Sequence, residues 1–377
     1  MSEPGFSPID HQHMARALEL ARLGLGRVEP NPMVGAVVAD GQRVVATGHH
    51  AAFGGPHAEA AALAAAGDAA RDATLYVTLE PCCHHGKTPP CTEAILAAGI
   101  RRVVAAMEDP FAEVHGRGLA RLREAGLTVD VGLMEPQARR LNAPFIKRQL
   151  CGRPYVTAKW AMTLDGRLAA ASGDSKWVSS AEARQWVHSL RSRMDAICIG
   201  SGTAACDNPQ LTVRLNPGDT DYGRRPTRLV LDPRLALSPQ SLLVQTAGSV
   251  PLIVATGQNA YPQKTATLTD LGAEVLPLRT ADGDAVNLGL LLDELGRRGM
   301  THLLVEGGSR TLTSFFAADL VDAVAVFVAP KLIGGQPSHV APGPSGLDRM
   351  SLARAVLRPT YTPIGDDLLV QGVLRDY

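Results

Sequence analysis

Two segments decide the fold of the first part of the chain: His57-Ala58-Glu59 and, downstream, Pro81-Cys82-Cys83-His84-His85-Gly86-Lys87-Thr88-Pro89-Pro90-Cys91. One imidazole, from His57, and two thiolates, from Cys82 and Cys91, form a zinc ligand set that leaves a fourth tetrahedral position open. Zinc with three protein ligands typically holds a water there and lowers the pKa of that water to about 7. Glu59 follows His57 on the helix that we expect to carry both residues, and it is placed to move protons.

The order His-x-Glu, then Pro-Cys and a further cysteine, is the signature of zinc-dependent nucleobase deaminases. The cysteine spacing departs from that signature, because eight residues separate Cys82 from Cys91 instead of two. Gly86, Pro89 and Pro90 predict a tight, non-helical loop between them. The residues from Cys91 onward predict a helix, so the Cys91 thiolate should lie at a helix N-terminus, where the dipole favours it.

A closed structural zinc site is the alternative interpretation, with Cys83, His84 or His85 as the fourth ligand. The glutamate after the histidine argues against it, because a structural site does not need a proton carrier. We expect the ligand to be Cys82 and not Cys83, because the Pro-Cys pattern places it there.

Composition limits the class of protein. The chain has 377 residues, 45% of them hydrophobic, which is enough for two domains of ordinary size. Lys plus Arg and Asp plus Glu both total 37, so no basic excess indicates a nucleic-acid partner, and a small-molecule substrate is favoured. The six cysteines suggest ligands and free thiols in a reducing compartment. No secretory signal or span of about 20 apolar residues is evident, so we expect a cytoplasmic protein without membrane contact.

Hydrophobic periodicity predicts an α/β first domain. Helices are expected over 9–23 and 116–125, and around His57 and Glu59; strands are expected over 34–38, 43–47, 74–79, 102–106 and 127–131. Asp40-Gly41 is a strong hairpin signal between the first two strands. Both ligand segments fall at strand-to-helix junctions, where open α/β sheets bind their ligands.

A second α/β domain is expected after a helical stretch over 136–149, because Gly152-Arg153-Pro154 interrupts the pattern. We place the domains at residues 1–148 and 149–377. In the second domain strands are expected over 155–161, 195–199, 227–231, 251–255 and 302–305, with helices over 181–193 and 311–317.

The second domain lacks the Gly-x-Gly-x-x-Gly dinucleotide fingerprint after any strand. Its best nucleotide-binding candidate is Glu306-Gly307-Gly308-Ser309, which follows an apolar strand and precedes a helix whose free N–H groups suit a phosphate. Paired glycines at such a turn more often serve tight packing alone. Arg191 and Arg214 would anchor an anionic substrate if they met on one phosphate; the alternative is two solvated surface charges.

The chain resembles, nearly end to end, the RibD family of bifunctional deaminase–reductases of riboflavin biosynthesis. The motifs that carry the resemblance stand in the family's order: Asn31-Pro32-x-Val34-Gly35, His57-Ala58-Glu59, Glu80-Pro81-Cys82, Gly86-Lys87-Thr88-Pro89-Pro90-Cys91, Lys159, Leu164-Asp165-Gly166-Arg167, Asp207-Asn208-Pro209-x-Leu211-Thr212-Val213-Arg214 and Glu306-Gly307-Gly308. Cys83 is a departure, because the family more often has a small polar residue at that position.

The resemblance implies a cytidine-deaminase-like three-layer α/β/α domain followed by a dihydrofolate-reductase-like α/β domain. The first would hydrolyse the 2-amino group of 2,5-diamino-6-(5-phosphoribosylamino)pyrimidin-4-one with one zinc ion per chain. The second would use NADPH to reduce the ribosyl group to ribityl. The family also implies a homo-oligomer, a dimer or a tetramer.

The resemblance also implies residue roles. In the deaminase, His57, Cys82 and Cys91 would hold zinc, Glu59 would carry protons, and Asn31, His50, Lys87 and Thr88 would hold the substrate. In the reductase, the residues expected to face the cofactor are Ala161, Trp177, Thr203, Asp207, Gly308, Ser309, Arg310, Thr311, Leu312, Thr313 and Ser314. Those expected to face the substrate are Lys159, Ser175, Arg191, Leu211, Arg214 and Glu306. Either Lys159 or Asp207 would handle protons.

Two other functions stay open at this stage. Nucleic-acid deaminases share the zinc core, although the neutral charge and the large second domain disfavour that class. A zinc-stabilised binding module with one catalytically inactive half is the other, and the intact His57, Glu59, Cys82 and Cys91 disfavour it for the first domain.

Overall fold

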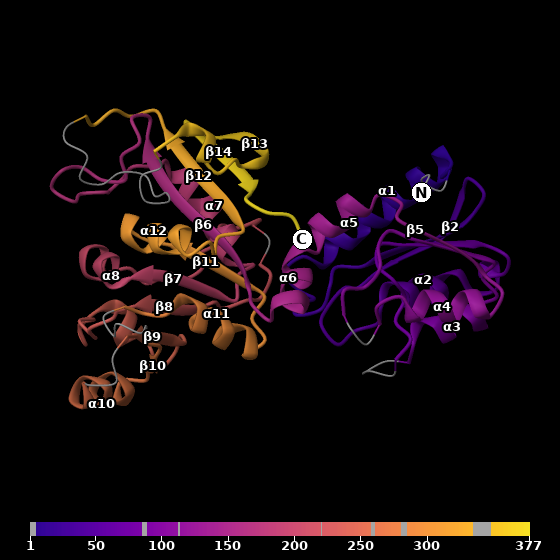
Figure 1. Cartoon of the computed structure of the whole chain (residues 1–377), viewed down its shortest axis with the longest axis horizontal. Coiled ribbons are helices and arrows are strands. Elements are labelled where there is room, and N and C mark those ends of the chain that lie inside the picture. Colours follow the sequence, from indigo (N-terminus) through magenta and orange to yellow (C-terminus); the bar gives the residue numbers. More distant parts are fainter. Residues whose placement is uncertain are drawn as a thin grey trace. The chain divides into compact units, whose positions relative to one another are not determined.

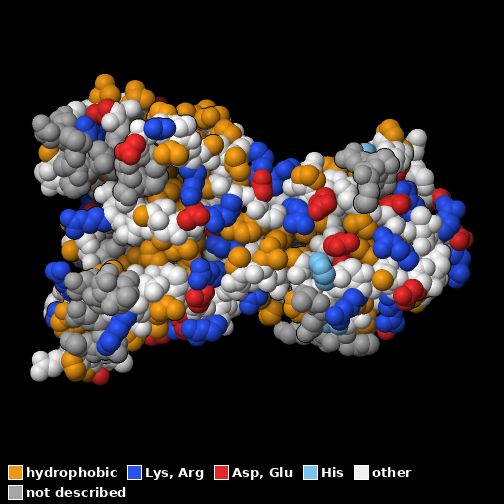
Figure 2. All heavy atoms as spheres, in the orientation of Figure 1, with side chains coloured by type: hydrophobic (Ala, Val, Ile, Leu, Met, Phe, Trp, Pro, Cys, Tyr) orange, Lys and Arg blue, Asp and Glu red, His pale blue; other side chains and the backbone are white. Residues whose placement is uncertain are grey.

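The computed structural model describes residues 5–84, 89–111, 114–219, 221–257, 261–279, 285–334 and 348–377. The chain divides into two compact units, Met1–Gly152 with Tyr377, and Arg153–Asp376 (Figure 1). In the part of the chain that the structure describes, we find no helix both long enough and apolar enough to cross a membrane. On the face visible in Figure 2, basic and acidic side chains are interspersed, as the equal numbers of the two lead us to expect.

The first unit contains a five-stranded sheet in the order β2-β1-β3-β4-β5. β1 is antiparallel to both of its neighbours, whereas β3, β4 and β5 run parallel. Its strands are β1 (Gly35–Asp40), β2 (Arg43–His49), β3 (Thr74–Val77), β4 (Arg102–Ala105) and β5 (Thr128–Val131). Its helices are α1 (Pro8–Ala21), α2 (Ala58–Ala66), α3 (Cys91–Ala97), α4 (Arg117–Glu124), α5 (Glu135–Leu141) and α6 (Ala143–Cys151), with short 3-10 turns η1 (Arg22–Gly24) and η2 (Gly67–Ala70).

Two glycines in the first hairpin allow helices to pack closely on both faces of this sheet. A Cβ atom at Gly35 would lie 2.0 Å from the carbonyl oxygen of Ala17 in α1, and one at Gly48 would lie 2.3 Å from that of Ala58 in α2. Gly48 pairs across the hairpin with Ala36, the neighbour of Gly35. Because successive strand residues point to opposite faces, α1 and α2 cover opposite faces. The expected three-layer α/β/α arrangement is confirmed.

The second unit contains a nine-stranded sheet in the order β10-β9-β8-β7-β11-β6-β12-β14-β13. All neighbours are parallel except β14, which is antiparallel to both β12 and β13. Its strands are β6 (Tyr155–Thr163), β7 (Ala196–Gly200), β8 (Thr227–Leu231), β9 (Leu252–Thr256), β10 (Glu274–Pro277), β11 (His302–Glu306), β12 (Ala323–Ala329), β13 (Leu357–Ile364) and β14 (Asp367–Val373). Its helices are α7 (Ala181–Arg191), α8 (Ser201–Asp207), α9 (Leu242–Gln245), α10 (Pro262–Asp270), α11 (Leu288–Arg297) and α12 (Ser309–Ala317), with the 3-10 turn η3 (Met350–Leu352).

The interior strand β7 shows how helices cover both faces of this sheet. Ala196 and Cys198 pack in one apolar cluster with residues of α11 and α12. Ile197 and Ile199 pack in a second cluster with residues of α9 and α10. Alternating strand residues therefore enter different cores, so helices cover both faces, as a mainly parallel sheet requires. The expected second α/β domain is confirmed.

Candidate active sites

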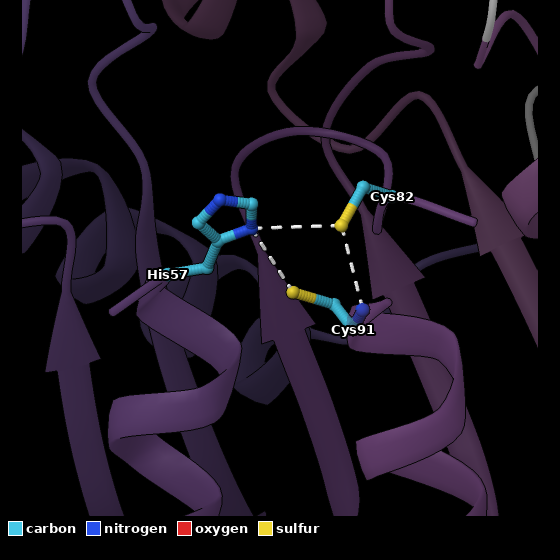
Figure 3. Close-up of side chains that lie close together, drawn as sticks. All are labelled: His57, Cys82 and Cys91. Carbon is cyan, nitrogen blue, oxygen red and sulfur yellow. Dashed lines mark hydrogen bonds between the residues drawn. The ribbon is translucent and has the colours of Figure 1, made fainter. Parts of the chain in front are cut away.

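Three side chains from distant parts of the first unit converge: His57, Cys82 and Cys91 (Figure 3). Nδ1 of His57 lies 3.2 Å from Sγ of Cys91 and 3.5 Å from Sγ of Cys82. A tetrahedral zinc ion, about 2.0 Å from a nitrogen and about 2.3 Å from a sulfur, separates those two atoms by about 3.5 Å. The three residues therefore fit zinc. The described part of the chain adds no fourth His, Cys, Asp or Glu to the group.

Two helix N-termini and the loop after β3 bring these ligands together. Cys91 is the first residue of α3, as expected from the sequence. The expectation that His57 lies within a helix is wrong: its backbone is extended, with φ −70° and ψ 158°, and α2 begins at Ala58. His57 is the N-cap, whose carbonyl oxygen accepts the first helical hydrogen bond from the N–H of Ala61 while its side chain stays outside the helix.

Glu59 lies in the first turn of α2 and is almost completely buried, with 3% of its surface exposed. Burial raises the pKa of this carboxyl to about 7, where it can both take up and release a proton. Hydrogen bonds from Cys91 and from His57 lower the pKa of the Cys82 thiol to about 4. The site therefore contains a thiolate suited to a metal and a carboxyl suited to proton transfer.

Two of the three residues, His57 and Cys82, line a cavity of about 560 Å³ in the first unit. Asn31 and His50, both predicted to hold the substrate, line it together with His57, Glu59 and Cys82. The amide nitrogen of Asn31 lies 3.3 Å from Nε2 of His50, and Nδ1 of His50 lies 2.9 Å from a backbone carbonyl oxygen. The His50 ring therefore donates at Nδ1 and accepts at Nε2. Lys87 and Thr88 lie outside the described residues.

Sequence reasoning gave no role to several residues that line this cavity: Glu80, Asp109, Phe111, Phe145 and Arg148. His84, considered only as a fourth ligand of a structural zinc site, also lines it. Glu80 is buried and fixes the cavity wall. Its carboxylate accepts hydrogen bonds from the backbone N–H groups of Asp109, Gly116, Gly118 and Leu119, at 2.8–3.3 Å. Because Glu80 is separated from Cys82 only by Pro81, these bonds also hold the cysteine loop against the start of α4. Of the residues without a predicted role, only Glu80 had a signal in the sequence: it belongs to the family motif Glu80-Pro81-Cys82, but the motif did not indicate its role.

A second cavity, of about 850 Å³, lies in the second unit at the carboxyl ends of β6, β7 and β11. It is lined by most residues that were predicted for the cofactor and the substrate of a reductase. These are Lys159, Ala161, Ser175, Arg191, Thr203, Asp207, Leu211, Glu306, Gly308, Ser309, Arg310, Thr311 and Ser314.

Glu306 holds two cations at this cavity. Lys159 and Glu306 occupy paired positions on the parallel strands β6 and β11, and their Nζ and Oε2 atoms are 3.8 Å apart. Arg191 binds both oxygens of the same carboxylate, at 2.6 and 2.9 Å. Burial alone would raise the pKa of Glu306, but the charges of Arg191 and Lys159 lower it to about 2. The carboxylate therefore stays ionised at neutral pH.

The paired-glycine turn after β11 leads directly into the N-terminus of α12. The N–H of Gly308 donates to Oγ1 of Thr203 at 2.9 Å, which fixes the turn. Gly308 is the N-cap of α12, so the first N–H groups of that helix face the cavity that Ser309 and Arg310 line. A Cβ at Gly307 would lie 3.2 Å from that of Thr311, so the glycines also serve packing. The paired glycines therefore serve packing, and the free N–H groups at the start of α12 could in addition bind a dinucleotide phosphate.

Four of the predicted reductase residues do not line this cavity. Leu312 is fully buried in the core, and Thr313 follows it on α12. Trp177 is 61% exposed and stacks on Arg184, with the guanidinium carbon 4.4 Å from the ring centroid. Arg214 is exposed, and its Nη2 lies 3.3 Å from a ring nitrogen of His188.

The interpretation that Arg191 and Arg214 meet on one phosphate is not supported. Arg191 already binds Glu306 with two hydrogen bonds. Arg214 contacts the ring of His188 through both its side chain and its backbone N–H. Arg191 is therefore not a solvated surface charge, whereas Arg214 is exposed and lies beside His188.

Comparison with known proteins assigns each unit to a family. Residues 7–107 match the cytidine and deoxycytidylate deaminase zinc-binding region, and residues 154–358 match the RibD C-terminal domain. The chain is 42% identical over 362 residues to the riboflavin biosynthesis protein RibD of Aquifex aeolicus, covering 96% of this chain and 98% of the relative.

Solved structures agree over the full chain. RibD from Acinetobacter baumannii is 34% identical with a TM-score of 0.83, covering 97% of this chain and 98% of that one. The diaminohydroxyphosphoribosylaminopyrimidine deaminase/5-amino-6-(5-phosphoribosylamino)uracil reductase of Thermotoga maritima is 37% identical with a TM-score of 0.80, covering 96% and 98%. The chain therefore belongs to the RibD family, the bifunctional enzymes of riboflavin biosynthesis that combine a zinc-dependent deaminase with an NADPH-dependent reductase.

Proposed function

We propose that His57, Cys82 and Cys91 hold the zinc ion and that Glu59 is the proton carrier of the deaminase. The observation that carries this assignment is the convergence of one imidazole nitrogen and two thiol sulfurs at separations that suit tetrahedral zinc. The substrate is 2,5-diamino-6-(5-phosphoribosylamino)pyrimidin-4-one. Its 2-amino group is exchanged for oxygen with the release of ammonia.

Zinc, when bound, supplies a Lewis acid that activates water at neutral pH. Glu59 takes a proton from the attacking water and delivers it to the departing amine, which its burial and raised pKa of about 7 favour. Asn31 and His50 orient the pyrimidine ring, because both present hydrogen-bonding groups to the cavity. We assign Lys87 and Thr88 to the phosphoribosyl arm on the basis of the family motif.

For the reductase we propose that the turn at Gly308 and the start of α12 hold the phosphates of the cofactor. Ala161, Thr203 and Asp207 line the same cavity and would complete the cofactor site. NADPH, when bound, supplies a hydride to C1′ of the ring-opened sugar. The substrate would contact Lys159, Ser175, Leu211 and Glu306. For Trp177, Leu312, Thr313 and Arg214, which lie outside the cavity lining, the family resemblance alone supports a role.

We assign the proton of the reductive step to Lys159. Its ammonium group is largely buried beside Glu306, and burial lowers its pKa, which makes release of a proton easier. Asp207, the other candidate, is half-buried, and burial raises its pKa. The rate of NADPH oxidation against pH, measured in Lys159→Ala and in Asp207→Asn, separates the two candidates. A proton donor acts only while it is protonated, so its removal should abolish the fall in rate on the alkaline side of the profile.

The assay of the proposed function supplies the diamino nucleotide first and NADPH second. Ammonia release should require zinc, so removing the metal with a chelator should stop it and adding zinc back should restore it. Oxidation of NADPH should begin only after ammonia is released. Ammonia release that is unaffected by the removal of bound metal, verified by elemental analysis, would contradict the zinc assignment.

We further propose that the chain acts as a homo-oligomer. The support is the outer edge of the nine-stranded sheet, where Tyr361 and Leu357 on β13, and Leu368 on the neighbouring β14, are 64%, 36% and 39% exposed. An apolar edge strand with unpaired backbone groups is usually covered. Light scattering of the full chain would give the mass of a dimer or a tetramer; a monomer at micromolar concentration would contradict this proposal.

A further inference from the structure

Helix α6 forms one wall of the deaminase cavity. Phe145 and Arg148, three residues apart on this helix, both line the cavity that also contains His57 and Glu59. Residues at this spacing lie on the same face of a helix. Together with Gln149, which also lines the cavity, Phe145 and Arg148 give this wall one aromatic ring, one guanidinium group and one amide.

The Arg148 side chain forms no hydrogen bond or ion pair with any residue that the structure describes. Its Nε atom is buried without a partner. By contrast, Arg139 on α5 binds Glu135 at 2.6 Å. An arginine that lines a cavity without an ion-pair partner is available to bind an anion that enters the cavity.

The other charged side chains around this cavity are acidic. Glu59, Glu80 and Asp109 line it, and among the described lining residues Arg148 is the one lysine or arginine. Glu80 is already bound by four backbone N–H groups. A phosphate ester that enters this cavity meets carboxylates of like charge and needs a cation to offset them. Arg148 is the described residue able to supply that charge.

We propose that Arg148 binds the phosphate of the pyrimidine nucleotide in the deaminase cavity and selects the phosphorylated substrate over its dephosphorylated form. This inference rests on the proposed function of the first unit. A guanidinium group presents parallel N–H donors that match two phosphate oxygens, and the two Nη atoms of Arg148 provide such a pair. Phe145 beside it excludes water from one side, which strengthens the interaction.

The test measures kcat/KM for ammonia release with two substrates, the 5′-phosphorylated diaminopyrimidine ribonucleotide and the same compound without phosphate. Arg148→Gln should lower the ratio of the two values by about 10- to 100-fold, mainly through KM for the phosphorylated form. Arg148→Lys should retain part of the preference, because it keeps the charge. Arg140→Gln, at an exposed position on α5 outside the cavity lining, is the matched control and should keep the wild-type ratio.

Inorganic phosphate provides a second readout. It should compete with the phosphorylated substrate in the zinc-loaded wild-type enzyme, and its inhibition constant should rise at least about 5-fold in Arg148→Gln. An unchanged substrate ratio in Arg148→Gln would overturn the proposal. An equal loss with both substrates would also overturn it, because it would show that Arg148 shapes the cavity wall without contacting phosphate.

Failure of the proposed function has a different signature. Wild-type enzyme that releases no ammonia from either substrate would contradict the deaminase assignment itself. In that case phosphate titration of the zinc-loaded wild type and Arg148→Gln, followed by ³¹P line width, decides the inference: weaker binding in the variant supports it, and equal binding overturns it.

Discussion

Glu59 and Glu306 are buried carboxylates that line a cavity, one in each compact unit, and their surroundings act on them in opposite directions. Around Glu59 burial dominates and raises the pKa of the carboxyl to about 7. Around Glu306 the charges of Arg191 and Lys159 outweigh burial and lower the pKa to about 2. The first is suited to exchange protons, and the second is suited to remain a fixed negative charge.

The opposite pKa shifts of Glu59 and Glu306 suit the two different reactions that the chain catalyses. Hydrolytic deamination moves protons between water and an amine, so its site needs a carboxyl with a pKa near the working pH. In the second unit the ionised Glu306 instead positions the cationic Lys159 and Arg191 at the cavity proposed for the reductase. The following predictions test whether each glutamate performs only its own role.

The largest effect is expected for Glu59→Gln, which removes the proton carrier and keeps its shape. Ammonia release should fall by about 10²- to 10⁴-fold, the usual contribution of general acid–base catalysis. NADPH oxidation with the deaminated substrate should keep its wild-type rate, because Glu59 belongs to the first unit only. Steady-state assays of both steps measure this.

A matched control for that variant is Glu93→Gln on α3, where the carboxylate is exposed and binds Arg121. It should leave both rates within a factor of two. If Glu59→Gln abolished both activities in a protein that still unfolds cooperatively, the independence of the two sites would be wrong.

Glu306→Gln should disrupt the second unit. It leaves the nearly buried Arg191 and Lys159 without their counter-charge, and breaking a buried ion pair on one side typically destabilises a protein by about 3–5 kcal/mol. Reduction should be lost while ammonia release persists. All three tryptophans of the chain lie in the second unit, at positions 160, 177 and 186, so their fluorescence during urea unfolding reports on this unit within the full chain.

Glu274→Gln is the control for this prediction, because Glu274 pairs with Arg298 at a half-exposed position. Exposed pairs contribute about 0–1 kcal/mol. Equal destabilisation by Glu274→Gln and Glu306→Gln would remove the contrast between a buried and an exposed charge.

The pH dependence of stability should follow the sign of the Glu306 shift. Its folded pKa of about 2 lies below the value of about 4.3 in an unfolded chain. The contribution to the free energy of unfolding is therefore complete above about pH 4.3 and is lost as the pH falls toward about 2. Tryptophan-detected unfolding from pH 7 to pH 3 should show this loss in wild type, and the slope should be smaller in Glu306→Gln.

The smallest effect is expected for Cys83→Ser. Cys83 is next to the ligand Cys82 but does not belong to the converging group of His57, Cys82 and Cys91. Zinc content measured by atomic absorption should stay at one ion per chain, whereas Cys82→Ser should lower it. Stoichiometric loss of zinc in Cys83→Ser would show that the wrong cysteine was assigned.

Local signals in the sequence predicted much of the fold. The hairpin between β1 and β2 was evident because Asp40-Gly41 alone favours the turn, and Gly41 adopts φ 57°. β12 was missed because its run of seven apolar residues, Ala323–Ala329, lacks the alternation that identifies a strand. β13 was missed because nearly all its residues are exposed, so it has no alternating pattern to detect.

The zinc ligands were predictable because their residue types and order carry the chemistry. Contacts between residues far apart in the sequence could not be predicted in this way. The four N–H groups that bind Glu80 come from residues 109–119, and the pairing of Arg191 with Glu306 depends on α7 ending beside β11, which no local pattern specifies. The position of His57 outside α2 was missed because sequence periodicity does not fix a helix boundary to the residue.

One measurement tests the two-step account most directly: give the Glu59→Gln enzyme NADPH with the diamino nucleotide, then with its deaminated product, and follow absorbance. The account predicts almost no NADPH oxidation with the diamino nucleotide and a wild-type rate with the deaminated one. Rapid NADPH oxidation with the diamino nucleotide in Glu59→Gln, without ammonia release, would contradict it, because reduction would then not depend on the deamination at Glu59.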